Sequence, residues 1–398
     1  MNLLIEILQA ISTVLLNPVF YWLIVLIYLP GDRRIQLEYK LFNQTVSPLH
    51  AELNNTLKFS IIASSLLLIF TIGTGVSFTH EMVLILTVVL ILLTYKNNYI
   101  FLSASYTLGI TFILLYIIPD EFMSTFPISQ KTYVSITLLI GLMLIAEGFL
   151  FHFYKDDEAF STLSFSKRGR WYGKLQLSKM SIIPLILFVP DHGTTTIGNF
   201  WPQFAFGDVN YTLFIMPFAI GFNHYIKGSL PSVVTKAISK KVFVLAFIVI
   251  GLSLLSFFIP IFTLIAACVA TIGRGLIHYL HYRADKRMSP YFFDMDPQVR
   301  VLGVVANSQA ENLGFQLGDS IIKVKDEVIQ SFEHFKQVFD ETEGYCKFEV
   351  QNATGEIKVI INEQKEESLE SFGLIFGTEP VRYVWVRRKK FFPYTAIG

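Results

Sequence analysis

Long apolar stretches follow one another almost without interruption from the start of the chain to about residue 282, where the composition changes abruptly. A helix needs about 20 predominantly apolar residues to cross a bilayer. Only 16% of the 398 residues are charged, against about a quarter in ordinary soluble domains, which excludes an ordinary cytosolic enzyme. The pattern predicts an α-helical polytopic membrane bundle followed by a small soluble α+β domain.

Several segments have the length and apolarity of a membrane crossing. They are 59–78, 82–95, 99–118, 132–154, 204–226, 241–258 and 259–282. Residues 1–29 are ambiguous because Pro18 bends a helix, and residues 181–190 read as a tilted span or a re-entrant loop. The first segment lacks a basic start and a small-residue cleavage site, so we expect it to be retained. We expect about eight crossings, with about seven to nine allowed.

The basic residues predict the orientation of these spans. Lys and Arg gather in the loops around 33–58, 155–179, 227–241 and 283–287, whereas the loops around His80, 120–130, 191–202 and Pro260 hold one lysine, Lys131. Short cytoplasmic loops accumulate basic residues. We therefore expect a multi-pass cell-membrane protein whose C-terminal domain lies in the cytoplasm.

The ionisable residues inside the predicted spans that are candidates for function are Glu147, Arg274 and His278. Such residues mark substrate paths or pair with one another. Glu147 and Arg274 lie at similar depths from the cytoplasmic ends of their spans, so we predict that they pair across helices. His278 and His281 are spaced as a metal pair on one helix face, but no third ligand is nearby in the sequence, so we predict no metal site.

From Val299 the sequence reads as short alternating segments. We predict a strand at 299–305, two strands within 320–329 joined at Asp326-Glu327, an amphipathic helix from an N-cap at Ser331 to Glu341, and a hairpin turning at Thr354-Gly355. The stretch "LGVVANSQAENLGFQLGDSIIKVKDEVI" resembles the core of a bacterial PDZ domain. The residues that carry the resemblance are Ser308, Ala310, Gly314, Gly318, Asp319, Ile321 and Val324.

The resemblance implies that a peptide binds as an added strand beside the helix. The strand that would pair with the peptide appears near the end, as "SFGLIFG", so we predict a circularly permuted PDZ fold. The predicted peptide-binding residues are Phe372, Gly373, Leu374, Ile375, Phe376, Phe335 and Val338. The Gly373 backbone would receive a carboxylate or a main-chain carbonyl. The alternative is a closing strand whose edge is already occupied.

The complete arrangement resembles the MinJ family of cell-division topological determinants, which are multi-span proteins with one C-terminal PDZ domain. The predicted domains are 1–282 for the membrane part, 283–298 for a linker, 299–377 for the PDZ-like domain and 378–398 for a tail. The resemblance implies a scaffold that links MinD with MinC to DivIVA and to late division proteins. A transporter or membrane sensor with a PDZ regulatory module is the alternative.

Other functional classes find little support. His80-Glu81 is not followed by a second histidine at zincin spacing, and no serine-protease domain fits in the chain, so we expect no catalytic residues, cofactor or enzyme activity. A formal charge of +1 creates no field for nucleic acid. Cys268 and Cys346 are too few and too differently placed for a disulfide framework.

The tail "VRYVWVRRKKFFPYTAIG" combines aromatic rings with a basic run. The run consists of Arg387, Arg388, Lys389 and Lys390. Basic residues contribute about 1 kcal/mol each at an anionic leaflet, and aromatic rings favour the headgroup level. We predict that the tail binds membrane lipid, the alternative being a solvated charge run.

Overall fold

The computed structural model divides the chain into two compact units. It describes residues 15, 17–74, 78–96, 99–118, 130–166, 169–190, 203–206, 209–293, 298–342, 344–363 and 368–378. The membrane unit comprises Met1–Gly31, Leu49–Ala159 and Gln176–Ser289, and the PDZ-like unit comprises Asp32–Pro48, Phe160–Leu175 and Pro290–Gly398. The basic tail run at 387–390 lies outside the described residues.

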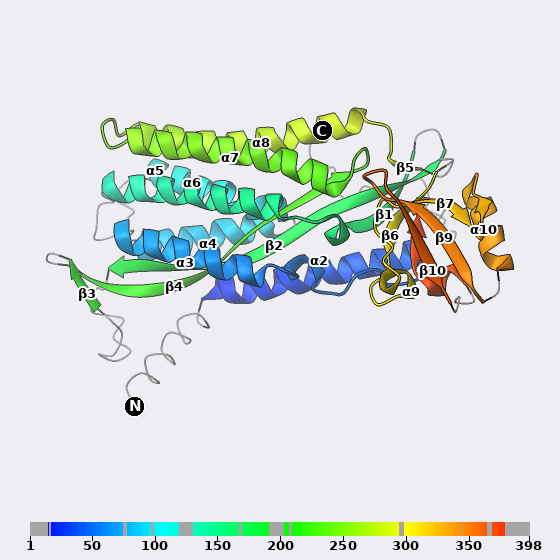
Figure 1. The fold of residues 1–398 in the computed structure, drawn as a ribbon. Coiled ribbons are helices and arrows are strands. Elements are labelled where there is room, and N and C mark those ends of the chain that lie inside the picture. The colour runs from blue at the N-terminus through cyan, green and yellow to red at the C-terminus, as the bar shows by residue number, and fades with distance from the viewer. Residues whose placement is uncertain are drawn as a thin grey trace. The chain divides into compact units, whose positions relative to one another are not determined.

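Helices dominate the membrane unit (Figure 1). They are α3 (Leu57–Thr74), α4 (His80–Thr94), α5 (Ala104–Ile117), α6 (Gln130–His152), α7 (Pro231–Leu255) and α8 (Phe262–Arg287), with short 3-10 turns η1 (Ala51–Leu53), η2 (Tyr99–Leu102) and η4 (Asp156–Glu158). Four of them, α3, α6, α7 and α8, are long and apolar enough to cross a membrane. The predicted membrane helical part is thereby confirmed.

The helix α2 (Pro18–Phe42) begins in the membrane unit and ends in the PDZ-like unit. The side chain of Asn17 accepts a hydrogen bond from the backbone nitrogen of Val19 at 2.9 Å, so the predicted interruption at Asn17-Pro18 is the start of this helix. Proline suits that position because the first helical residues need no backbone donor.

Small residues bring α6 and α7 close together. A side chain at Gly141 would meet the side chain of Ile250, and one at Gly148 would meet the ring of Phe243. Helices in lipid gain little from apolar burial against one another and associate through such close backbone contact. In Figure 1, α7 and α8 run side by side.

Two predicted spans are wrong, because the structure makes them strands. Residues 181–190 belong to β2 (Trp171–Pro190), and 204–226 is covered by β3 (Gln203–Phe206) and β4 (Val209–Ile226). These strands form a sheet of order β1-β2-β4-β3, with β1 at Phe160–Phe165. Pro184 and Pro217 lie inside the two segments and oppose a continuous helix. Hydropathy alone does not separate a buried strand from a buried helix.

The PDZ-like unit contains an antiparallel sheet of order β10-β9-β7-β6-β11, with β8 paired to β7. Its strands are β6 (Val299–Val304), β7 (Ser320–Val324), β8 (Glu327–Val328), β9 (Cys346–Gln351), β10 (Ile357–Asn362) and β11 (Leu374–Phe376), and its helices are α9 (Gln309–Asn312), α10 (Phe332–Glu341) and α11 (Leu369–Phe372). Ser331 caps α10 by accepting a hydrogen bond from the His334 backbone nitrogen at 3.1 Å. The predicted small α+β domain is confirmed, including this N-cap.

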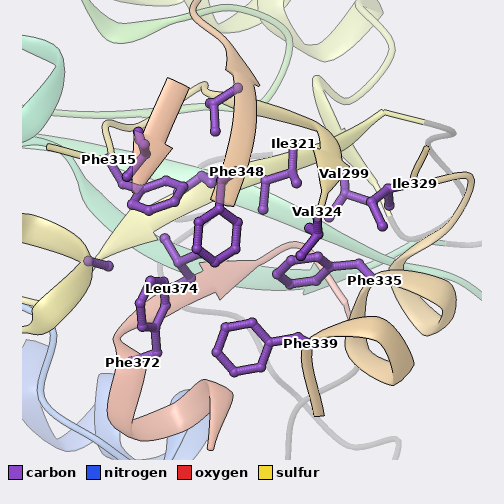
Figure 2. Packing of buried hydrophobic residues seen from close by; sticks show 14 of the residues in the cluster. Val299, Phe315, Ile321, Val324, Ile329, Phe335, Phe339, Phe348, Phe372 and Leu374 are labelled. Atoms are coloured by element: carbon purple, nitrogen blue, oxygen red, sulfur yellow. The ribbon is translucent and has the colours of Figure 1, made fainter. Parts of the chain in front are cut away.

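Aromatic side chains form the core of this unit. Figure 2 shows Phe335, Phe339, Phe348 and Phe372 gathered in one buried cluster. Their ring centroids lie 5.3 Å apart for Phe339 and Phe372 and 5.7 Å apart for Phe348 and Phe372. Each ring buries about 150–250 Å² of surface, so these contacts dominate the packing energy of the unit.

Segments from earlier in the chain also belong to the PDZ-like unit, and the sequence did not reveal them. The Val46 carbonyl accepts a hydrogen bond from the Ala306 backbone nitrogen at 2.9 Å, and Ser161 Oγ donates to the Leu302 carbonyl at 2.9 Å. Strand β5 (Phe292–Phe293), within the predicted linker, pairs with β2 through Tyr172 and Gly173. Two predicted cytoplasmic loops therefore contribute to the structure around the C-terminal sheet.

Candidate functional site

The helix α10 and the strand β11 bring most of the predicted peptide-binding residues together. The centroid of the Phe376 ring lies 5.2 Å from that of Phe332 and 5.4 Å from that of Phe335. Strand β11 stands at one end of the sheet order among the described strands, with β6 on one side. This is the geometry in which an added peptide strand would lie between an edge strand and a helix.

The predicted residues divide between two faces of β11. Leu374 and Phe376 belong to the same buried cluster as Phe335, Val338 and Phe372. Ile375 is also buried but lies outside that cluster, and it neighbours Gly303 on β6. Side chains alternate between the two faces of a strand, so Ile375 points away from α10.

Gly373 has a structural role that the sequence did not predict. It ends α11 in the left-handed region with a φ of 92°, and its backbone nitrogen donates to the Leu369 carbonyl at 3.3 Å. Its carbonyl accepts a hydrogen bond from the Val305 backbone nitrogen at 2.9 Å. A side chain at this position would overlap Ser308, so only glycine fits the turn that leads into β11.

The space beside the end of β11 is small. A pocket of about 20 Å³ is lined by residues of β5, the start of β6, Phe332 and Phe376. A cavity of this size holds about one water molecule. Entry of a further side chain at this place would require the contact between Phe332 and Phe376 to open.

The outward face of the sheet is charged rather than apolar around β7 and β9. Lys323 Nζ lies 2.8 Å from Glu349 Oε2 across these strands. The Glu349 carboxylate raises the pKa of the Lys323 ammonium, because it accepts a hydrogen bond from it and carries the opposite charge. Both side chains are partly exposed, so the pair is a surface feature.

The predicted pair between Glu147 and Arg274 is confirmed. Arg274 Nε on α8 lies 2.7 Å from Glu147 Oε1 on α6, and both side chains are 0% exposed. Ser103 Oγ donates to the other carboxylate oxygen at 2.5 Å and lies 2.9 Å from Ser105 Oγ. The carboxylate thus has a partner on each oxygen, as a buried charge requires.

Beside this pair lies a group of side chains that we call the His–Arg cluster, made of His224, Arg274, His278 and His281. The ring centroid of His224 on β4 lies 4.7 Å from that of His278 and 5.6 Å from that of His281. The sequence placed His224 in a separate span and so could not associate it with α8. Among the described residues, no group of three His, Cys, Asp or Glu side chains is arranged to hold a metal ion.

No family model matches the chain. The cell division topological determinant MinJ of Bacillus subtilis (strain 168) is 25% identical to it over 378 residues, which are 94% of this chain and 95% of the relative. The alignment therefore extends over both the membrane unit and the PDZ-like unit. The chain is similar to MinJ along nearly its whole length, and the MinJ-type resemblance predicted from the sequence is confirmed.

Proposed function

We propose that this chain is a membrane-anchored scaffold that recruits protein partners to the cell division site through its PDZ-like unit. The observation that carries the proposal is the similarity to a cell division topological determinant over 94% of the chain. The predicted partners are proteins of the MinD and DivIVA types. We expect no catalysis and no cofactor in this role.

The contacts around β11 support a peptide-binding edge in this unit. The Val305 backbone nitrogen donates a hydrogen bond to the Gly373 carbonyl, so that carbonyl faces β6. Successive residues of an antiparallel strand alternate in the side to which their backbone groups point, so those of Leu374 point away from β6. A peptide strand would bond to these groups, and its side chains would enter between Phe332 and Phe376. The closed contact between those two rings favours partners that supply a large apolar side chain to replace it.

The membrane unit would hold this edge at the cytoplasmic surface of the bilayer. The last span ends with Lys286 and Arg287 in the final turn of α8, as expected for a cytoplasmic helix end. We propose that the PDZ-like unit lies on that side. We also propose that the basic tail, Arg387 to Lys390, binds anionic lipid, which would favour partners that are themselves bound to the membrane.

A membrane sensor is the second candidate function. The observation that favours it is the buried ionisable group of Glu147, Arg274 and the neighbouring histidines inside the membrane unit. Ionisable residues at such depth are costly and often functional. A sensor of this kind would signal through the same PDZ-like unit, so the two candidates share the recruitment step.

Recruitment is tested with a charged substitution at the entrance of the proposed edge. Phe332→Asp places a carboxylate where the apolar peptide side chain would enter, so co-purification of division proteins with the full-length chain should fall by about tenfold or more. The matched control is Ile361→Asp on β10, a 49% exposed side chain at the other end of the sheet order.

Both variants must reach the membrane at normal levels for the comparison to count. Equal recruitment by Phe332→Asp and by Ile361→Asp would contradict the proposed site. Gly373→Val is a poor test, because the new side chain would overlap Ser308 and disrupt the turn itself.

A further inference from the structure

Unpartnered buried polar atoms concentrate at one place in the membrane unit. Within the part of the chain that the structure describes, eight buried side-chain nitrogen or oxygen atoms make no hydrogen bond with the protein. Five of the eight belong to the His–Arg cluster, namely His224 Nε2, Arg274 Nη1, Arg274 Nη2, His278 Nδ1 and His281 Nε2. Folded proteins pair the great majority of such atoms, so this concentration points to a ligand.

The cluster is built by three elements that also bury it. Arg274, His278 and His281 follow one another at helical spacings of four and three residues, so they share one face of α8. His224, which is 2% exposed, meets them from β4. Phe151 of α6 closes the site, because its ring lies 5.4 Å from the Arg274 guanidinium carbon and 5.6 Å from the His224 ring.

The charges of the cluster determine the kind of ligand. The Nε of Arg274 is engaged by Glu147, which leaves both terminal amino groups as buried donors. A guanidinium has no acceptor, and it repels a metal cation. Its remaining donors therefore require an acceptor, and a compact anion can accept several of them at once.

A proton must accompany such an anion. Glu147 and Arg274 already cancel each other, so an added anion would leave a net buried charge. Three imidazoles adjoin the site, and protonation of one of them restores neutrality and adds a donor. We propose that the His–Arg cluster binds a small monovalent anion of the chloride type together with one proton.

Other titratable groups surround this site. Asp285 lies one turn beyond His281 on α8 and accepts hydrogen bonds from the Lys227 and Gly228 backbone nitrogens at 3.0 and 3.1 Å. Lys241 on α7 adds a positive charge near His281, and Tyr106 on α5 lies near Arg274. Asp285 is engaged by backbone donors and Glu147 by Arg274 and Ser103, whereas one nitrogen of each of the three imidazoles makes no hydrogen bond with the protein.

The test is the thermal unfolding of the full-length protein in nanodiscs of neutral lipid. Sodium chloride is titrated against sodium gluconate at equal ionic strength, since gluconate is a much larger anion than chloride. Chloride should raise the unfolding temperature in a saturable way and gluconate should not. At pH values where the histidine of the anion-free protein is neutral, each anion should bind with one proton. In that range, each unit decrease in pH should lower the half-saturating chloride concentration by about tenfold.

Variants then assign the effect to the cluster. His278→Gln should weaken both the chloride response and its pH dependence, whereas His334→Gln, on α10 of the PDZ-like unit, should leave them unchanged. Bromide soaked into crystals of the wild-type protein should give an anomalous peak within hydrogen-bonding distance of Arg274, a result that does not depend on any variant folding. Equal responses to chloride and gluconate, or a bromide peak elsewhere, would show that water alone satisfies these atoms and would overturn the proposal.

Discussion

Both units of this protein bury aromatic rings, and the membrane unit adds an ion pair that is completely enclosed. The membrane unit encloses the ion pair of Glu147 and Arg274 at 0% exposure, whereas the PDZ-like unit encloses a cluster of phenylalanine rings. Water drives the rings together, but apolar burial gives helices in lipid little reason to associate. The buried pair therefore fixes a contact between α6 and α8 in the membrane unit, whereas ring packing fixes the core of the PDZ-like unit.

The difference also separates the ligands that we propose for the two units. The aromatic core supports an edge strand, β11, whose remaining backbone groups suit a peptide. The charged interior of the membrane unit leaves donors that suit a small ion.

Loss of one core ring should destabilise the PDZ-like unit most. Phe348→Ala removes a 0% exposed ring in contact with Phe315 and Phe372, and should lower the free energy of unfolding of this unit by about 3–5 kcal/mol. Urea-dependent proteolysis of the full-length protein measures the change. Tyr345→Ala, at a half-exposed neighbouring position, is the control and should change stability little. Equal effects would mean that the ring cluster is not the core of the unit.

Breaking the buried ion pair should lower the stability of the membrane unit nearly as much. The size of this loss should depend on whether the other member of the pair keeps its charge. Arg274→Gln leaves the Glu147 charge unpaired, so the stability of the membrane unit should fall by about 3–5 kcal/mol. The double variant Glu147→Gln with Arg274→Gln should recover part of this loss, because no lone charge remains. Thermal unfolding in detergent gives the double-mutant cycle. Strictly additive losses would show that the pair is not coupled, and Arg283→Gln, exposed on the same helix, serves as the control.

Removing the cap of α10 should have a smaller effect. Ser331→Ala eliminates the hydrogen bond to the His334 backbone nitrogen and should destabilise the PDZ-like unit by about 1 kcal/mol. Ser331→Asp keeps a capping oxygen and should retain the wild-type value. The same proteolysis assay compares the two. A loss shared by both variants would point to a role of the hydroxyl other than capping.

The exposed pair of Lys323 and Glu349 should contribute least to stability. Its ammonium and carboxylate lie 2.8 Å apart, close to the 2.7 Å between Arg274 Nε and Glu147 Oε1, but solvent screens them. Lys323→Gln should leave the urea midpoint of the PDZ-like unit unchanged within error. A loss comparable to that of Arg274→Gln would contradict the idea that burial, rather than distance, sets the value of an ion pair here.

The elements of the PDZ-like unit could be predicted from the sequence more closely than those of the membrane unit, for physical reasons. Turn and cap residues such as Ser331 and Gly355 act locally, so the elements of the PDZ-like unit could be placed closely. The strands β2 and β4 were missed because a buried strand and a buried helix are equally apolar, although Pro184 and Pro217 opposed a helix. That error also hid His224, whose neighbours on α8 come from a distant part of the chain.

At the candidate peptide edge, too, the sequence did not reveal contacts that arise only in the fold. The resemblance to PDZ domains identified the strand that contains Leu374 and Phe376, but not the alternation that turns Ile375 to the other face. The role of Gly373 depends on Ser308, which lies 65 residues earlier in the numbering and becomes a neighbour only in the fold. The Glu147 and Arg274 pair could be predicted because depth in a bilayer follows from the sequence itself.

Site-specific photo-crosslinking in living cells tests the scaffold proposal most directly. A benzophenone amino acid replaces Phe332 at the proposed edge or Ile361 at the other end of the sheet order, and crosslinked proteins are identified by mass spectrometry. The scaffold account predicts that position 332 captures cell-division proteins and that position 361 does not. Capture of the same proteins from both positions, or from position 361 alone, would contradict it.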